Sequence, residues 1–188
     1  MTDNIPQTPE DETTARKAIE VDPYSANAYY NLGFLLSQNP ARASEAELAY
    51  RQAIELEPNN ARYVYRLGLV LHEHLHRFEE ADLTYRRAIE LAPDDPFYYG
   101  GLISLLIQQS RRSEALTFSK KMRVLLIAHR QGYGLATLDA ILGNAEAAIE
   151  YLRRAARTET FDRQWARNDP DLASIRDDRR FQEIVGSL

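Results

Sequence analysis

The sequence predicts an all-α fold built from repeated pairs of helices. Two markers carry this prediction. The pattern A-I-E-[VL]-x-P occurs at residues 18–23, 53–58 and 88–93, so each copy begins 35 residues after the one before it. A second marker keeps the same step, because Leu32-Gly33 is followed by Leu67-Gly68 and then by Leu102-Ile103. Two markers in one register indicate an internal repeat, which is the sequence signature of stacked, self-similar units.

Hydrophobic periodicity predicts two helices in each repeat. The first helices carry apolar or small residues at i, i+3, i+4 and i+7, the spacing of one buried helical face. These residues are Tyr29, Leu32, Gly33 and Leu36, then Val64, Leu67, Gly68 and Leu71, then Tyr99, Leu102, Ile103 and Leu106. The second helices repeat an Ala-x3-aromatic-x2-Ala pattern, with Ala46, Tyr50 and Ala53 followed by Ala81, Tyr85 and Ala88. The small residues on both helices allow a close approach of their axes.

Prolines mark the ends of the predicted helices. Pro23, Pro58 and Pro93 each follow a helical run, where the missing amide donor does least harm. Asp95-Pro96 combines an N-cap residue with a proline at the first helical position.

The composition is that of an ordinary globular protein. The 188 residues are 44% hydrophobic and 27% charged, with a net charge of −5, which does not favour generic nucleic-acid binding. The absence of cysteine excludes disulfides and thiolate metal sites. Without a signal peptide or an apolar run near the length of about 20 residues that spans a bilayer, the sequence predicts a soluble, cytoplasmic protein. No phosphate-binding loop, G-x-S-x-G or H-E-x-x-H motif occurs, so we expect no enzymatic activity and no cofactor.

These residues resemble the tetratricopeptide repeat (TPR), a helix–turn–helix unit of 34 residues with an aromatic-x2-Leu-Gly pattern, then Ala, aromatic, Ala and Pro. Tyr29 stands where the family usually has tryptophan, and the first two full units are one residue longer than the family length. The third and fourth units match less well, since Ile103 replaces glycine and Met122 replaces the last alanine. The resemblance implies a right-handed α-solenoid.

The predicted organisation follows from this resemblance. A disordered tail (1–8) precedes a lone capping helix (9–24), and the repeats and a C-terminal cap follow. The repeats are 25–59, 60–94, 95–128 and 129–160, and the cap, 161–188, is similar to the ending of many bacterial TPR arrays. We expect Trp165, Leu172 and Phe181 to pack inward, because terminal units must cover an apolar face.

The family resemblance also implies a concave face lined by the first helices, which would bind a peptide or a partner protein. The residues beside the buried stripe are Asn27, Tyr30, Asn31, Phe34, Arg62, Tyr65, Arg66, Leu69, Phe97 and Ser104. Aromatic and arginine side chains are the usual anchors of protein interfaces, so we expect an apolar partner with some acidic residues. Aromatic residues at helical spacing can equally be packing residues. The lysine–asparagine–arginine clamp by which some relatives hold acidic chain termini is absent.

Three other functional hypotheses remain open on the sequence. His72 and His76 are one helical turn apart and form a weak candidate zinc or nickel site. The chain could also be a homo-oligomerising subunit of a larger assembly. A third hypothesis, low in rank, is nucleic-acid contact through the C-terminal arginines, which alternate with aspartates. These arginines are Arg153, Arg154, Arg157, Arg163, Arg167, Arg176, Arg179 and Arg180.

Overall fold

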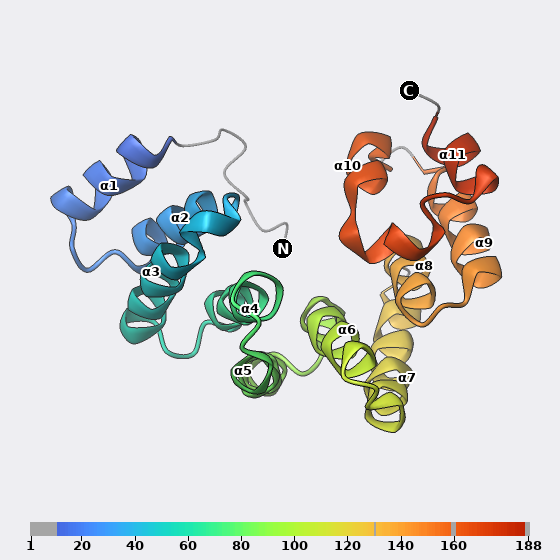
Figure 1. Cartoon of the computed structure of the whole chain (residues 1–188), viewed down its shortest axis with the longest axis horizontal. Coiled ribbons are helices and arrows are strands. Elements are labelled where there is room, and N and C mark those ends of the chain that lie inside the picture. The colour runs from blue at the N-terminus through green and yellow to red at the C-terminus, as the bar shows by residue number, and fades with distance from the viewer. Residues whose placement is uncertain (1–10, 130, 159–160, 187–188) are drawn as a thin grey trace. The chain divides into compact units, whose positions relative to one another are not determined.

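The computed structural model describes residues 11–129, 131–158 and 161–186, and every regular element in those ranges is helical. The chain divides into two compact units, Met1–Pro93 and Asp94–Leu188 (Figure 1). The predicted all-α fold is therefore confirmed. The predicted disordered tail, residues 1–8, lies outside the described residues.

The first unit contains a lone helix followed by two helix pairs. Helix α2 packs on α3 and α4 packs on α5, while α1 packs on α2 and α3 packs on α4. Its elements are α1 (Glu12–Val21), α2 (Ala26–Ser37), η1 (Pro40–Arg42), α3 (Ala43–Leu56), α4 (Ala61–Leu69), η2 (Val70–His74) and α5 (Phe78–Leu91). The prolines predicted to follow helices do so, because α1, α3 and α5 each end two residues before one of them.

Local sequence explains where these helices begin. The side chain of Asp11 accepts a hydrogen bond from the amide of Thr14, and Ser25 and Asn60 cap α2 and α4 in the same way. Each cap satisfies one backbone donor that the first turn leaves unpaired. The longer repeats accommodate their additional residue between the paired helices. In the second repeat a π-helical turn, η2, leads to His76, which has a φ of +54°, and in the first repeat the 3₁₀ turn η1 occupies the equivalent place.

An arginine at the same place in both repeats ties successive second helices together. Arg77 binds Glu80 of its own helix and Glu47 of α3, at 2.6 and 2.8 Å. Arg42, 35 residues earlier, binds Glu45 at 2.6 Å and Glu12 of α1. Hydrogen bonds from Arg42 and then Arg16 lower the pKa of Glu12 to about 2. Because most of these groups are in contact with solvent, with Glu47 the most buried of them, the pairs contribute more to the register of the helices than to stability.

The second unit begins with helix pairs and ends in a compact cap. Helix α6 packs on α7, α7 on α8 and α8 on α9, and the cap elements η4 and α11 pack on α8 and α9. Its elements are η3 (Pro96–Tyr99), α6 (Gly100–Gln108), α7 (Arg112–Ala128), α8 (Gly132–Ile141), α9 (Ala145–Ala155), α10 (Arg163–Asn168), η4 (Pro170–Ile175) and α11 (Arg179–Val185). The division of the chain into four repeats and two caps stays a prediction.

The cap confirms two of the three residues predicted to pack inward. Leu172 and Phe181 are fully buried in a cluster with residues of α8 and α9. The prediction for Trp165 was wrong, because 58% of its surface is exposed. Its ring lies against Tyr133, with centroids 5.2 Å apart, and the hydroxyl of Tyr133 donates to Asp169 at 2.6 Å. Trp165 thus covers a partly buried tyrosine at the edge of the core instead of entering the core.

Candidate functional site

The first helices of the first unit bring together two of the predicted binding residues. The guanidinium carbon of Arg66, on α4, lies 5.1 Å from the centroid of the Phe34 ring, on α2. Both side chains are half-buried, so each also presents surface to solvent. An arginine over an aromatic face is attracted by the ring quadrupole. The two consecutive repeats therefore share one cationic–aromatic patch, which we call the Phe34–Arg66 patch.

Two other predicted residues, Tyr30 and Tyr65, are mostly interior. They are 9% and 7% exposed. The Tyr30 ring stacks on Tyr63 with centroids 5.0 Å apart, and Tyr65 lies 5.6 Å from Tyr85. Both side chains pack between the helices of the first unit and offer little surface to a partner.

The remaining predicted residues vary in exposure. In the first unit Asn27 is exposed, whereas Asn31, Arg62 and Leu69 are half-buried. Phe97 and Ser104 belong to the second unit, where Phe97 is 52% exposed and packs edge-on against Tyr98, and Ser104 is half-buried. Their role in binding stays a prediction.

Two polar atoms at this part of the first unit are buried, the hydroxyl of Tyr50 and the Nε of Arg66, and neither has a hydrogen-bond partner of good geometry among the described residues. Burial, as the largest cause, raises the pKa of the Tyr50 hydroxyl to about 12, although the Ser37 side chain, through a hydrogen bond, and the charge of Arg66 act in the opposite direction. In the next repeat the equivalent hydroxyl, that of Tyr85, meets Nδ1 of His72 at 3.3 Å.

This difference between equivalent tyrosines gives a testable prediction. Tyr85→Phe removes a hydrogen bond between two buried side chains, so we expect a loss of about 1 kcal/mol in the free energy of unfolding. Tyr50→Phe removes a buried hydroxyl that makes no hydrogen bond of good geometry, so we expect a smaller loss or none. Urea unfolding followed by circular dichroism measures both. A larger loss for Tyr50→Phe than for Tyr85→Phe would contradict the conclusion that Tyr85 makes the stronger hydrogen bond.

The candidate metal-binding histidines, His72 and His76, lie against aromatic rings. Among the residues that the structure describes, no group of three or more His, Asp or Glu side chains is placed to hold a metal ion. His72 is buried and lies edge-on to Phe78 and Tyr85, and His76 lies against the same Phe78 ring. Both imidazoles are thus packed on aromatic rings.

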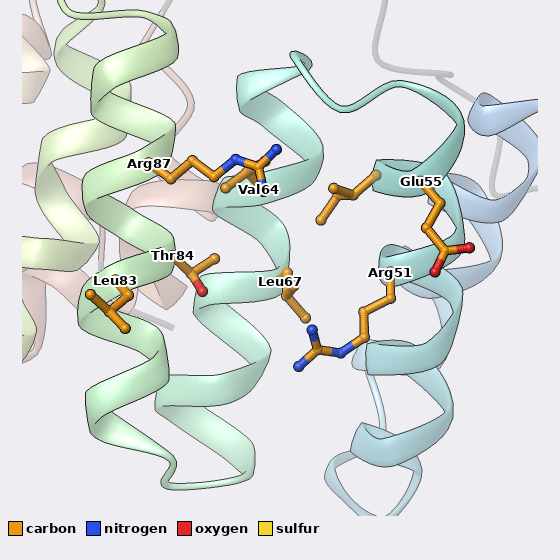
Figure 2. A pocket seen from close by; sticks show the side chains of 8 residues that line it. Arg51, Glu55, Val64, Leu67, Leu83, Thr84 and Arg87 are labelled. Atoms are coloured by element: carbon orange, nitrogen blue, oxygen red, sulfur yellow. The ribbon is translucent and has the colours of Figure 1, made fainter.

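Sequence reasoning missed a crevice in the first unit, which is lined by other residues than the Phe34–Arg66 patch. It lies between α3 and α5, has α4 as its floor, and has a volume of about 340 Å³. Figure 2 shows Arg51 reaching from α3 toward Leu67, and Arg87 reaching from α5 over Val64. The lining residues are Arg51, Ile54, Glu55, Val64, Leu67, Leu83, Thr84 and Arg87. We call this space the α3–α5 crevice.

The sequence does contain a signal for this crevice. Val64 stands 35 residues after Tyr29 and 35 before Tyr99, at the position where these two repeats carry an aromatic ring. Tyr99 is fully buried. A valine is smaller than the aromatic ring at the equivalent positions, and the crevice above it has both apolar and charged side chains in its walls.

Comparison with known proteins identifies the repeat pattern. Two family models, both described as tetratricopeptide repeat, match residues 14–47 and 61–95. No curated protein matches the sequence. Among the described residues, no helix has the length and apolar character needed to cross a bilayer.

Solved structures show the same fold. The crystal structure of MamA protein is 27% identical, with a TM-score of 0.57 over 63% of this chain and 64% of that one. The MamA RS-1 ArsTM double mutant is 20% identical, with a TM-score of 0.58 over 63% of this chain and 65% of that one. YrrB, described as a TPR protein with an unusual peptide-binding site, is 18% identical, with a TM-score of 0.54 over 94% of this chain and 90% of that one. The chain thus spans slightly less than two thirds of the length of either MamA structure.

Proposed function

The chain belongs to the tetratricopeptide repeat family, and on that premise we propose that it is a non-catalytic scaffold holding a segment of another polypeptide. The segment lies on the first-helix face of the first unit, across α2 and α4. YrrB, which shares the fold, is described as having a peptide-binding site, and Naa15/Naa10, 19% identical with a TM-score of 0.52 over 80% of this chain and 22% of that one, is described as bound to HypK-THB. The family and these neighbours support a protein-interaction role in general.

The Phe34–Arg66 patch is the observation that carries the proposal for this chain. It joins an apolar ring to a guanidinium group on consecutive repeats, at 5.1 Å. Arginine and aromatic residues are over-represented among the side chains that dominate binding energy at interfaces. Arg62, one turn before Arg66 on α4, adds a second positive charge. This chemistry suits a segment that places an apolar side chain on Phe34 and a carboxylate near the arginines.

Peptides selected on the wild-type protein from a displayed random library test this proposal. We expect Arg66→Ala and Phe34→Ala each to weaken binding of a selected peptide about tenfold, measured by fluorescence anisotropy. Both side chains are half-buried, so the helical circular dichroism should stay unchanged. Tyr65→Ala is a poor probe, because Tyr65 packs against Tyr85 and its loss would disturb the core.

Arg87→Ala is the matched control, since Arg87 is an exposed arginine at the α3–α5 crevice. It should leave the affinity of the selected peptide unchanged. Peptides whose affinity depends on Arg87 but not on Arg66 or Phe34 would show that the first-helix face is not the binding surface.

Nucleic-acid contact through the C-terminal arginines has little support. Arg154 binds Glu150 at 2.9 Å, Arg179 binds Glu183 at 3.0 Å, and Arg180 binds Glu146 at 2.7 Å. Arg167 donates to the carbonyl of Gly186 at 2.7 Å. Guanidinium groups engaged in this way form a solvated ion-paired surface, which lacks the basic excess that phosphate binding needs.

A further inference from the structure

The α3–α5 crevice has the shape and chemistry of a receptor for an aromatic side chain. Its floor is apolar, with Val64 and Leu67 supplied by α4. Val64 stands where the neighbouring repeats place Tyr29 and Tyr99, so the floor of this crevice carries a smaller side chain than the equivalent positions do. An aromatic ring that entered it would bury a large apolar area, which is the dominant source of binding energy for such residues.

Two arginines stand at the rim of the crevice. Arg51 is exposed on α3 and is paired with Glu47 at 2.8 Å and with Glu80 at 3.5 Å. Arg87 is exposed on α5, where its Nη2 donates to the carbonyl of Pro58 at 2.8 Å. These bonds hold both guanidinium groups beside the opening (Figure 2). Glu55 is the one carboxylate among the lining residues. Arg87 binds a carbonyl oxygen, which leaves its charge to attract an occupant that carries a carboxylate next to its aromatic ring.

The chain itself carries such a segment, at the turn between α1 and α2. Tyr24 and Val21 are 82% and 79% exposed, the two highest values among the large apolar side chains that the structure describes. The exposed carboxylates of Glu20 and Asp22 flank Val21. The Oδ1 of Asp22 accepts a hydrogen bond from the amide of Tyr24 at 3.1 Å, which fixes the turn. We call residues 20–24 the α1–α2 turn.

We propose that the α3–α5 crevice binds the α1–α2 turn of a second copy of this chain, with the Tyr24 ring over Val64. The carboxylates of the turn then face Arg51 and Arg87. This contact does not use the Phe34–Arg66 patch, so it is independent of polypeptide binding on the first-helix face. It joins two different surfaces, which leaves a dimer with one free turn at one end and one free crevice at the other. Such a heterologous contact generates open chains that grow beyond the dimer.

Sedimentation equilibrium of the purified protein tests the proposal. One ring and a few charges make a contact at the small end of protein interfaces, so association is expected at concentrations of about 0.1–1 mM. The weight-average mass should rise with concentration past about twice the monomer mass, because growth does not stop at the dimer. It should fall again at about 1 M salt, where the Debye length is about 3 Å.

Two substitutions block the contact from opposite sides. Val64→Tyr fills the crevice with the residue that the neighbouring repeats carry, and Tyr24→Ala removes the incoming ring from an exposed position. Each variant should remain folded by circular dichroism and stay monomeric at about 1 mM. If Val64→Tyr does not fold, Leu83→Glu, at an exposed position that lines the crevice, replaces it.

Mixing the two variants gives the sharpest result. Val64→Tyr keeps its turn and Tyr24→Ala keeps its crevice, so an equimolar mixture should form dimers and nothing larger. A wild type that is monomeric at about 1 mM would overturn the proposal. So would a Tyr24→Ala variant that associates as the wild type does, because the crevice would then take a different occupant.

Discussion

Replacing Phe181 with alanine is expected to destabilise the second unit by about 3–5 kcal/mol. The Phe181 side chain is fully buried, in one cluster with Ala136, Leu152 and Leu172. Truncation removes its transfer free energy and leaves a cavity among residues of α8, α9 and η4, which relax only partly. Because domains are stable by about 5–15 kcal/mol, this single change should remove a large share of the stability of the unit.

Trp165, the chain's single tryptophan, lies in the same cap, so its fluorescence reports urea unfolding of this unit. Trp165→Ala, followed by circular dichroism, is the matched control. It removes a larger side chain that is 58% exposed, and we expect a loss of less than about 1 kcal/mol. A larger loss for Trp165→Ala than for Phe181→Ala would show that Trp165, and not Phe181, is the aromatic residue in the core of the cap.

The cap shows what sequence reasoning could and could not reach. Phe181 and Leu172 were predicted to be buried because a terminal unit must cover an apolar face, and both are. The same argument failed for Trp165 because α10 has only six residues, too few for periodicity to define a buried face. Its position depends on Tyr133, a residue 32 positions earlier in the sequence.

The candidate binding face was predictable to a similar extent. The 35-residue register placed Phe34 and Arg66 on equivalent faces of consecutive first helices, and the structure brings them together. The register also placed Tyr30 and Tyr65 there, but neighbouring tyrosines cover them. Whether a residue beside the buried stripe is exposed depends on the size of residues across the helix pair. That information is not contained in the period of a single helix.

Pairs of residues across the helix interface explain why the third and fourth repeats depart from the family pattern. In the second repeat, a Cβ on Gly68 would lie 2.8 Å from the Tyr85 ring, and Gly33 faces Tyr50 at 2.9 Å in the first. Only glycine allows that ring so close to the backbone. The equivalent pairs, by position, are Gly33 with Tyr50, Gly68 with Tyr85, Ile103 with Ser119, and Ala136 with Leu152. All eight residues are buried, and a larger residue on one helix accompanies a smaller one on the other.

This size compensation predicts a strong coupling between Gly68 and Tyr85. Gly68→Ile alone should cost about 3 kcal/mol or more, because its side chain would overlap the ring and force the helices apart. Tyr85→Ser alone should cost about 3–5 kcal/mol, because it leaves a cavity at a fully buried position. The double variant reproduces the Ile–Ser pair of the third repeat. Its loss should be smaller than the sum of the single losses by about 1–3 kcal/mol.

A mismatched double variant separates true compensation from a general tolerance of the fold. Gly33→Ile combined with Tyr85→Ser introduces the same two residues, but Gly33 faces Tyr50 instead of Tyr85. The two losses in free energy of unfolding should add, to a total of about 6–8 kcal/mol. A loss of this size is comparable to the whole stability of many domains. In thermal unfolding followed by circular dichroism, the matched variant should therefore have a much higher midpoint temperature than the mismatched one. Equal midpoints would mean that the glycine and the tyrosine are not coupled, and the divergence of the later repeats would then need another cause than packing across the helix pair.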